Sequence, residues 1–367
     1  MNPPNPSPPE APATVSRAFA IGDSSGPGEA RRAAVALAGR LGFAETERGE
    51  IALIVTEAAT NLTRHAGGGT LILRPFPPGG LHDAESGLEI LVLDRGAGMP
   101  DVDRCRVDGY STVGGAGKGL GAIARLADRL EIHSDPGRGT ALLARVYLGP
   151  PPPASGAGAE TVQVGAVHLP MPGETVCGDA WAVDERPDRR RLLVADGLGH
   201  GQFAAEASGE AVRVFRERAD LPLEDLVHAL HAALRGTRGA ALAIAEQDLS
   251  RDAGPGEPGE LRYVGVGNVS GQLFDPADGS GRSLLSHNGT VGAKLLRVQR
   301  VVLPWPAGGL LVMHSDGLAT GWRLADHRGL VTRHPGLIAG LLYRDFVRGR
   351  DDATVVALRP HAGEPDR

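Results

Sequence analysis

Hydrophobic residues in the first half of the chain follow both helical and strand-like patterns. Apolar side chains recur at helical spacing in residues 28–43 and 47–66, which predicts two amphipathic helices. A third helix is predicted over residues 120–131. Apolar and alternating runs bounded by Gly, Pro and Asp predict four strands, over residues 15–21, 69–75, 87–94 and 139–148. The mixture of helices and strands indicates an α+β arrangement.

The second half has its predicted strands near both ends and its predicted helices between them. Amphipathic patterns predict long helices over residues 202–219 and 223–236. Apolar runs predict strands over residues 161–170, 181–185, 190–196, 308–316 and 353–360. This order indicates sheets that stack on one another and are covered by helices.

Two Pro-rich stretches interrupt these patterns and divide the chain. The first is the N-terminal segment, and the second contains four consecutive prolines followed by Gly, Ala and Ser. Such compositions are typical of extended or flexible segments that do not pack into a core. We therefore expect a disordered tail at 1–13, a first domain at 14–148, a linker at 149–160, a second domain at 161–360 and a C-terminal tail at 361–367.

Composition excludes several classes of protein. A formal net charge of −6 argues against a nucleic-acid-binding protein with a broad basic face. The two cysteines, Cys105 and Cys177, cannot build a disulfide framework and lack metal-finger spacing, so a reducing compartment is expected. No apolar run approaches the 18 residues of a membrane span, and the N-terminus lacks the layout of a signal peptide. We expect a cytoplasmic protein that binds neither membranes nor nucleic acid.

Three polar or glycine-rich motifs follow one another in the first half. Glu57 and Asn61 are four residues apart in a predicted helix and therefore share one face, which could also be an ordinary solvated face. Asp94-Arg-Gly-Ala-Gly98 directly follows a predicted strand and, taken alone, could be a turn. Residues 114–121 form a Gly-rich run that leads into a helix, where backbone N–H groups can approach phosphates.

In this order the three motifs resemble the GHKL ATP-binding fold, over about residues 15–147. The short span between the glycine motifs is most similar to the RsbT type of anti-sigma-factor serine/threonine kinases. The resemblance implies that Asn61 holds Mg²⁺ on the ATP phosphates and that Asp94 accepts a hydrogen bond from the adenine amino group. Gly96 and Gly98 would allow the close approach of the base.

The same resemblance assigns the phosphate lid and the kinase base. It implies that Gly117, Gly119 and Leu120 line the lid, whereas Lys118 either contacts a phosphate or is a solvated lysine. Glu57 would orient or deprotonate the hydroxyl group of a protein serine or threonine. Such a role is chemically plausible because phosphoryl transfer needs positioning and charge neutralisation more than covalent help.

Acidic residues fall at strand ends throughout the second half. The motifs are Cys177-Gly-Asp179, Asp196-Gly-Leu-Gly-His-Gly201, Ser315-Asp-Gly-Leu318 and Asp351-Asp-Ala-Thr354. Any one of them is more often a turn, but four beside apolar strands in one segment favour a shared site. Carboxylates without matching Cys or His ligands suit hard cations such as Mg²⁺ or Mn²⁺.

These four motifs resemble the metal-dependent type 2C serine/threonine phosphatases in their compact SpoIIE/RsbX branch, over residues 161–360. The resemblance implies that Asp196 bridges two Mn²⁺ or Mg²⁺ ions with the Gly197 carbonyl as a further ligand. Asp316 and Asp351 would complete one metal, and Asp179 would act on the other. The expected fold is therefore a GHKL (Bergerat) α/β sandwich followed by a type 2C phosphatase β-sandwich flanked by helices.

Three neighbours of these motifs receive other roles. Cys177 is interpreted as a bystander, because no His-paired thiolate signature surrounds it. His200 is interpreted as a supporting or structural residue, and Asp352 as either a metal ligand or a neighbour of one.

Together the two resemblances predict a bifunctional switch enzyme of bacterial stress signalling. It would use ATP and Mg²⁺ in the first domain and two Mn²⁺ or Mg²⁺ ions in the second. Its phosphoprotein partners would be STAS-domain anti-sigma antagonists or stressosome proteins. Two alternatives stay open: a phosphatase whose first domain only binds nucleotide and docks a partner, and a phosphohydrolase of small molecules.

Overall fold

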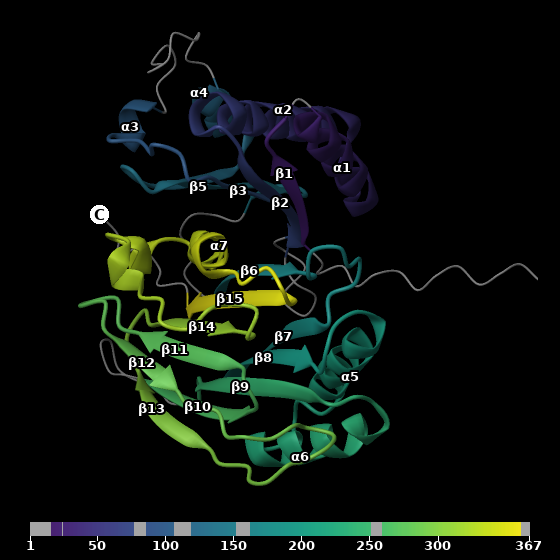
Figure 1. The fold of residues 1–367 in the computed structure, drawn as a ribbon. Coiled ribbons are helices and arrows are strands. Elements are labelled where there is room, and N and C mark those ends of the chain that lie inside the picture. The colour runs from purple at the N-terminus through teal and green to yellow at the C-terminus, as the bar shows by residue number, and fades with distance from the viewer. Residues whose placement is uncertain are drawn as a thin grey trace, which may run out of the picture.

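The computed structural model describes residues 16–23, 25–76, 86–105, 119–151, 162–250 and 259–360. Within these ranges the chain builds three five-stranded sheets and the helices that cover them (Figure 1). No helix in the described ranges is both long and apolar enough to span a membrane.

The first sheet carries helices on one face. Its strands run antiparallel in the order β1-β2-β3-β5-β4. The core on this face, which includes Ile51, Ile54 and Leu73, lies between the sheet and the helices. The elements are β1 (Arg17–Ile21), α1 (Gly26–Leu41), α2 (Glu45–Asn61), β2 (Gly69–Phe76), β3 (Gly87–Leu93), α3 (Val102–Cys105), α4 (Gly119–Leu126), β4 (Arg129–Asp135) and β5 (Gly139–Tyr147).

The other two sheets pack face to face. Their strand orders are β13-β10-β9-β8-β7 and β12-β11-β14-β15-β6, and a core that includes Trp181, Tyr263 and Met313 fills the space between them. Helices α5 and α6 cover the outer face of the first of these sheets. The elements are β6 (Val162–Leu169), β7 (Asp179–Arg186), β8 (Arg189–Gly197), α5 (Gln202–Glu217), α6 (Leu223–Ala233), β9 (Ala240–Asp248), β10 (Gly259–Val266), β11 (Ser270–Phe274), β12 (Gly281–Leu284), β13 (Val301–Trp305), β14 (Leu310–His314), α7 (Pro335–Phe346) and β15 (Ala353–Pro360).

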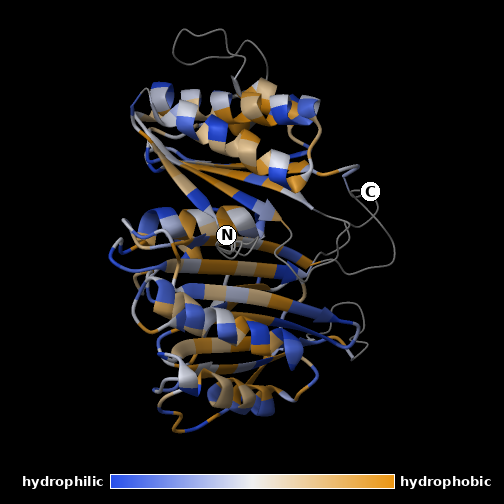
Figure 2. Cartoon of the chain, turned by 90° about the vertical axis from the view of Figure 1, so that its right-hand side faces the viewer, coloured by the Kyte–Doolittle hydropathy of each residue, from blue (hydrophilic) through white to orange (hydrophobic). Residues whose placement is uncertain are grey.

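Helix α7 lies between the N-terminal sheet and the β12-β11-β14-β15-β6 sheet, so that both halves share one apolar core (Figure 1). That core joins Leu91 and Leu143 of the first sheet to Leu337 and Leu341 of α7. A Cβ atom built on Gly340 would lie 2.7 Å from Leu91 Cδ2, so glycine allows the helix to approach the sheet. Figure 2 shows this sequence of layers, with apolar positions on the strands and on helix faces turned toward them. The two halves are therefore packed against each other.

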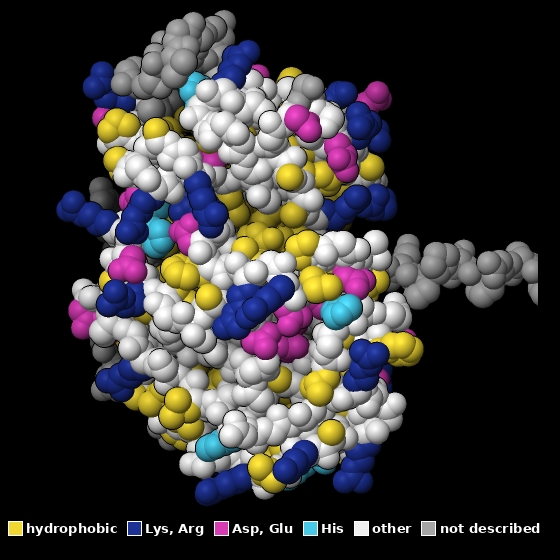
Figure 3. Space-filling view, in the orientation of Figure 1, with side chains coloured by type: hydrophobic (Ala, Val, Ile, Leu, Met, Phe, Trp, Pro, Cys, Tyr) yellow, Lys and Arg dark blue, Asp and Glu magenta, His cyan; other side chains and the backbone are white. Residues whose placement is uncertain are grey.

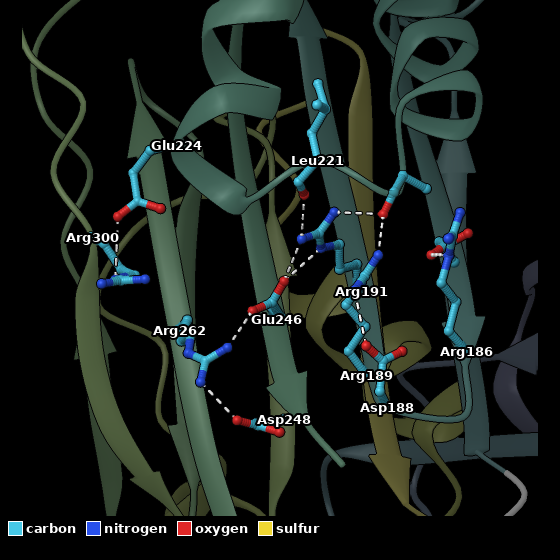
Figure 4. Close-up of polar contacts among 12 residues, drawn as sticks. Arg186, Asp188, Arg189, Arg191, Leu221, Glu224, Glu246, Asp248, Arg262 and Arg300 are labelled. Atoms are coloured by element: carbon cyan, nitrogen blue, oxygen red, sulfur yellow. Dashed lines mark hydrogen bonds and ion pairs between the residues drawn. The ribbon is translucent and has the colours of Figure 1, made fainter. Parts of the chain in front are cut away.

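A network of ion pairs covers the polar end of β8, β9 and β10 (Figure 4). Arg191 is buried and donates to Glu246 at 2.6 Å and to the Leu221 carbonyl at 2.8 Å. Arg262 joins Glu246 to Asp248 at 2.9 and 2.6 Å. The charged positions of these strands thus hold the α5–α6 connection against the sheet.

The α+β architecture agrees with the sequence-based expectation, and two local differences stand out. The helix predicted over 120–131 is wrong in its second half, because α4 ends at Leu126 and β4 begins at Arg129. Leu130 and Ile132 both pack into the first core, which is the two-residue period of a strand rather than that of a helix. The second difference is that the sequence patterns did not predict α7 or the strands β9 to β13.

Candidate active sites

The acidic motifs of the second half converge at one end of the β-sandwich. Asp179 begins β7 and Asp196 lies one residue before the end of β8, and the two residues are direct cross-strand partners. Asp316 follows β14 and Asp351 precedes β15, and the charges of both act on Asp196. Acidic side chains gather in one patch on the face shown in Figure 3. The structure therefore brings together the four carboxylates that the sequence reading selected.

A hydrogen-bond framework fixes the buried part of this cluster. Ser315 Oγ donates to Asp179 Oδ2 at 2.7 Å and accepts from the Thr354 amide at 3.0 Å. Asp352 accepts from the amides of Met171 and Gly178, one on each oxygen, both at 2.8 Å. Because both of its oxygens are engaged, Asp352 supports the turn before Asp179.

The glycines of the acidic motifs are needed for close packing of the backbone. A Cβ atom on Gly197 would lie 2.1 Å from the Ala204 carbonyl oxygen. A Cβ atom on Gly317 would lie 2.0 Å from the Asp352 carbonyl oxygen. Any other residue would push these loops apart and move the adjacent Asp196 and Asp316 carboxylates.

Burial and mutual repulsion make this cluster costly to ionise. Burial raises the pKa of Asp179 to about 7, against the hydrogen bond from Ser315. Burial, together with the charge of Asp179, raises the pKa of Asp196 to about 9. A divalent cation would remove this penalty, and an oxygen-only donor set is the kind that Mg²⁺ and Mn²⁺ prefer. The residues present therefore fit the metals that the sequence predicts.

Neighbouring side chains take supporting positions. Burial raises the pKa of the Cys177 thiol, so this cysteine is not a thiolate nucleophile. His200 Nδ1 lies 2.8 Å from Glu174 Oε1 in an exposed pair. Asn268 Nδ2 donates to Asp316 Oδ2, a contact that the sequence patterns did not predict.

The polar helix motif of the first half lies against the beginning of α4. Asn61 ends α2 and is followed by a π-helical turn over Leu62–Ala66, an irregularity that is frequent at functional sites. A Cβ atom on Gly119 would lie 3.0 Å from Asn61 Oδ1 and 3.2 Å from Glu57 Oε2. Glu57, Asn61 and the start of α4 are therefore neighbours, and α4 is called the lid helix below because it begins within the predicted phosphate lid. Leu120 follows in α4, whereas Gly117 and Lys118 lie outside the described residues.

The Asp94 motif forms the adjoining wall of this site. Asp94 Oδ1 accepts from the amides of Gly96 at 2.8 Å and Thr140 at 3.1 Å. Gly98 has a positive φ of 69°, which glycine adopts without strain. A Cβ atom on Gly96 would lie 2.8 Å from Cα of Ala66, so the Asp94 loop packs against the end of the π-helical turn. This arrangement suits a nucleotide whose phosphates face the lid helix.

Each half of the chain matches a known protein family. Residues 27–146 match the family model of the histidine kinase-like ATPase domain, and residues 186–361 match that of stage II sporulation protein E (SpoIIE). Serine/threonine-protein kinase RsbT of Bacillus subtilis is 34% identical over 112 residues, which cover 30% of this chain and 81% of RsbT. Phosphoserine phosphatase RsbX of the same organism is 28% identical over 163 residues, which cover 43% of this chain and 76% of RsbX.

One solved structure is also similar to part of this chain. That structure is described as "The bacterial stressosome: a modular system that has been adapted to control secondary messenger signaling". That chain is 27% identical with a TM-score of 0.48, and the match covers 55% of this chain and all of that one. The identity to RsbT and the two family models show that the chain belongs to the RsbT family through an N-terminal GHKL, histidine kinase-like ATPase domain, which is joined to a SpoIIE/RsbX-like, metal-dependent serine/threonine phosphatase domain.

Proposed function

We propose that this chain both adds phosphate to and removes phosphate from serine or threonine residues of the same protein partner. The observation that carries this proposal is the presence, on one chain, of a Glu57–Asn61 pair at the lid helix and a separate carboxylate cluster at the sandwich edge. The first arrangement suits phosphoryl transfer from ATP, and the second suits metal-assisted hydrolysis.

In the kinase half, each polar group has a distinct task. Asp94, held by two backbone amides, would accept from adenine through its remaining lone pairs. Asn61 would hold Mg²⁺, and Gly117, Lys118, Gly119 and Leu120 would line the phosphates. Glu57 lies beside Asn61 and would orient the hydroxyl group of the incoming protein.

In the phosphatase half, the carboxylates would hold two divalent ions. Asp196 would bridge them with help from the Gly197 carbonyl, while Asp316 and Asp351 complete one ion and Asp179 acts on the other. When bound, such a pair of ions lowers the pKa of a water molecule and orients it for in-line attack on a phosphoryl group. Ser315 keeps Asp179 in place, and Asp352 keeps the preceding turn in place.

The partner would be a STAS-domain anti-sigma antagonist or a stressosome protein in the cytoplasm. The names of the two relatives, a serine/threonine-protein kinase and a phosphoserine phosphatase, support opposite reactions on one substrate class. The net direction of phosphate flow would then follow from how ATP and divalent ions load the two sites.

The test uses the full chain with Asp196→Asn, so that added phosphate is retained. This protein is incubated with γ-labelled ATP and Mg²⁺ in a lysate of its source organism, and nucleotide binding is measured separately. We expect a labelled protein band that is absent when Glu57→Gln is added to the same chain. The band should lose its label when wild-type protein and Mn²⁺ are supplied. Asp188→Asn, at an exposed carboxylate, is the matched control for both steps.

Two outcomes would change this proposal. Nucleotide binding without a labelled band would show that the first domain is a docking module and that the phosphatase is the only enzyme on the chain. Hydrolysis of nucleotides but not of phosphopeptides by the wild type would instead show a small-molecule phosphohydrolase.

A further inference from the structure

Two histidines and an aspartate that belong to neither candidate site meet where the two halves of the chain pack together. His133 and Asp135 are two residues apart on β4 and so project from the same face. His327 comes from the other half, next to the 3₁₀ turn Leu324–Asp326 ahead of α7. His133 Nε2 and His327 Nδ1 each lie 3.2 Å from Asp135 Oδ2, and each histidine is only 5% exposed.

His327 lies between the carboxylates of Asp345 and Asp135, and a neutral imidazole can donate a hydrogen bond to only one of them. Its Nε2 lies 3.4 Å from Asp345 Oδ2, so a neutral imidazole with its single N–H there presents a lone pair at Nδ1. That lone pair faces a carboxylate oxygen of Asp135, which is also an acceptor. The contact is favourable only if a proton or a metal ion lies between the two atoms.

The distances suit a transition-metal ion. Zinc binds imidazole nitrogen at about 2.0–2.1 Å and carboxylate oxygen at about 2.0–2.2 Å, which places neighbouring ligand atoms about 3.3 Å apart in a tetrahedral site. The two distances of 3.2 Å to Asp135 Oδ2 agree with this value, and all three ligand atoms lie within 4.8 Å of one another. Two imidazoles with one carboxylate favour zinc or a similar metal over Mg²⁺.

The surroundings of His327 are those of a metal ligand. Metal-binding histidines almost always donate their other N–H to a carboxylate, a carbonyl or water, which fixes the tautomer and the ring orientation. Asp345 provides such a carboxylate and is itself held by Arg344, from Nε to Oδ1 and from Nη2 to Oδ2, both at 2.8 Å. Arg344 also donates to the Asp94 carbonyl at 2.7 Å.

We propose that His133, Asp135 and His327 bind one divalent transition-metal ion, of the Zn²⁺ class, at the junction of the two halves. The ion would be coordinated both by β4 of the ATPase half and by the segment that precedes α7 of the phosphatase half. It is separate from the carboxylate centre and does not depend on the proposed kinase or phosphatase reactions.

The test uses Co²⁺ as a spectroscopic probe on the full chain with Asp196→Asn, which weakens the carboxylate centre, and with Mg²⁺ in excess. We expect one bound equivalent of Co²⁺ with the visible absorption of four-coordinate cobalt, displaced by Zn²⁺. His133→Gln and His327→Asn should abolish this absorption while retaining a polar group near Asp135. Asp345→Asn should keep the stoichiometry but weaken binding about 10–100-fold. His228→Asn, at an exposed histidine on α6, is the matched control.

Two results would overturn the proposal. One is the absence of Co²⁺ binding by the folded protein, which would leave a proton as the occupant between His327 and Asp135. The other is a Co²⁺ spectrum that is unchanged in folded His133→Gln and His327→Asn variants. Circular dichroism of each variant establishes that it is folded, so loss of binding is not mistaken for loss of structure.

Discussion

Replacing Asp196 by Asn should abolish Mn²⁺-dependent phosphatase activity and yet make the metal-free protein more stable. Asp196 lies beside Asp179 in a partly buried cluster, and burial with this neighbouring charge raises its pKa from 3.8 to about 9. At pH 7 without metal, the folded protein therefore keeps this carboxyl protonated, whereas the unfolded chain ionises it. Asn has a similar shape and carries no such penalty.

The size of the effect follows from the pKa. Holding a group with an ordinary pKa of 3.8 protonated at pH 7 costs about 4 kcal/mol, at about 1.36 kcal/mol per pH unit. Water that enters this half-open site reduces the penalty, so we expect Asp196→Asn to gain about 2–4 kcal/mol at pH 7. Because the pKa of Asp196 is raised in the folded state, the free energy of unfolding of the metal-free wild type falls as pH rises from about 4 toward 9.

Urea denaturation with EDTA at pH 5, 6, 7 and 8 measures this effect. The free energy of unfolding of Asp196→Asn minus that of the wild type should increase with pH. Adding Mn²⁺ should stabilise the wild type and leave the variant nearly unchanged. Asp188→Asn, an exposed control, should shift stability by less than about 1 kcal/mol. A metal-free Asp196→Asn protein that is less stable than the wild type, or a gain independent of pH, would refute the reasoning.

Three further changes test other parts of the structure. Glu89→Gln leaves two buried arginines, Arg74 and Arg145, without their counter-charge and should lower the free energy of unfolding by about 3–5 kcal/mol in urea denaturation. Burial alone would raise the pKa of Glu89, but the two arginines outweigh it and lower that pKa. The stabilisation by Glu89 is therefore present at neutral pH and is lost in acid. An unchanged unfolding midpoint would contradict this. Arg344→Ala removes a charged hydrogen bond to the Asp94 carbonyl and should cost about 1.5–3 kcal/mol with weaker nucleotide binding, whereas undiminished affinity in calorimetry would argue against the link. Gly317→Ala forces Cβ to within 2.0 Å of the Asp352 carbonyl oxygen and should lower phosphatase activity at least about tenfold without changing nucleotide binding, which a phosphopeptide assay and calorimetry check.

Much of the candidate chemistry was readable from local sequence. Asp196 and Asp316 follow apolar strands, and the order of motifs along the chain was enough to predict one carboxylate site. The Glu57–Asn61 spacing placed both residues on one helix face, and the structure sets them against Gly119. The positions of these residues agree with the patterns because hydrophobic period and turn chemistry act over only a few neighbouring residues. Their chemical roles stay predictions.

Other features could not be read in this way. The segment over residues 120–131 had helical spacing, but the pairing of β4 with β5 imposes a strand on its second half. Whether Asp352 binds metal or supports the site depends on its hydrogen bonds to Met171 and Gly178, which lie far away in the chain.

The sequence by itself indicated most of the helices, the strands that flank the acidic motifs, the candidate residues and the resemblance to two families. Only the tertiary structure decided that α7 lies between two sheets and that His133 and Asp135 meet His327. A periodic pattern shows that a side chain needs burial, but any apolar face of suitable shape can provide it. The partner that does so is chosen by the packing of the whole chain, and so are the contacts made at that junction.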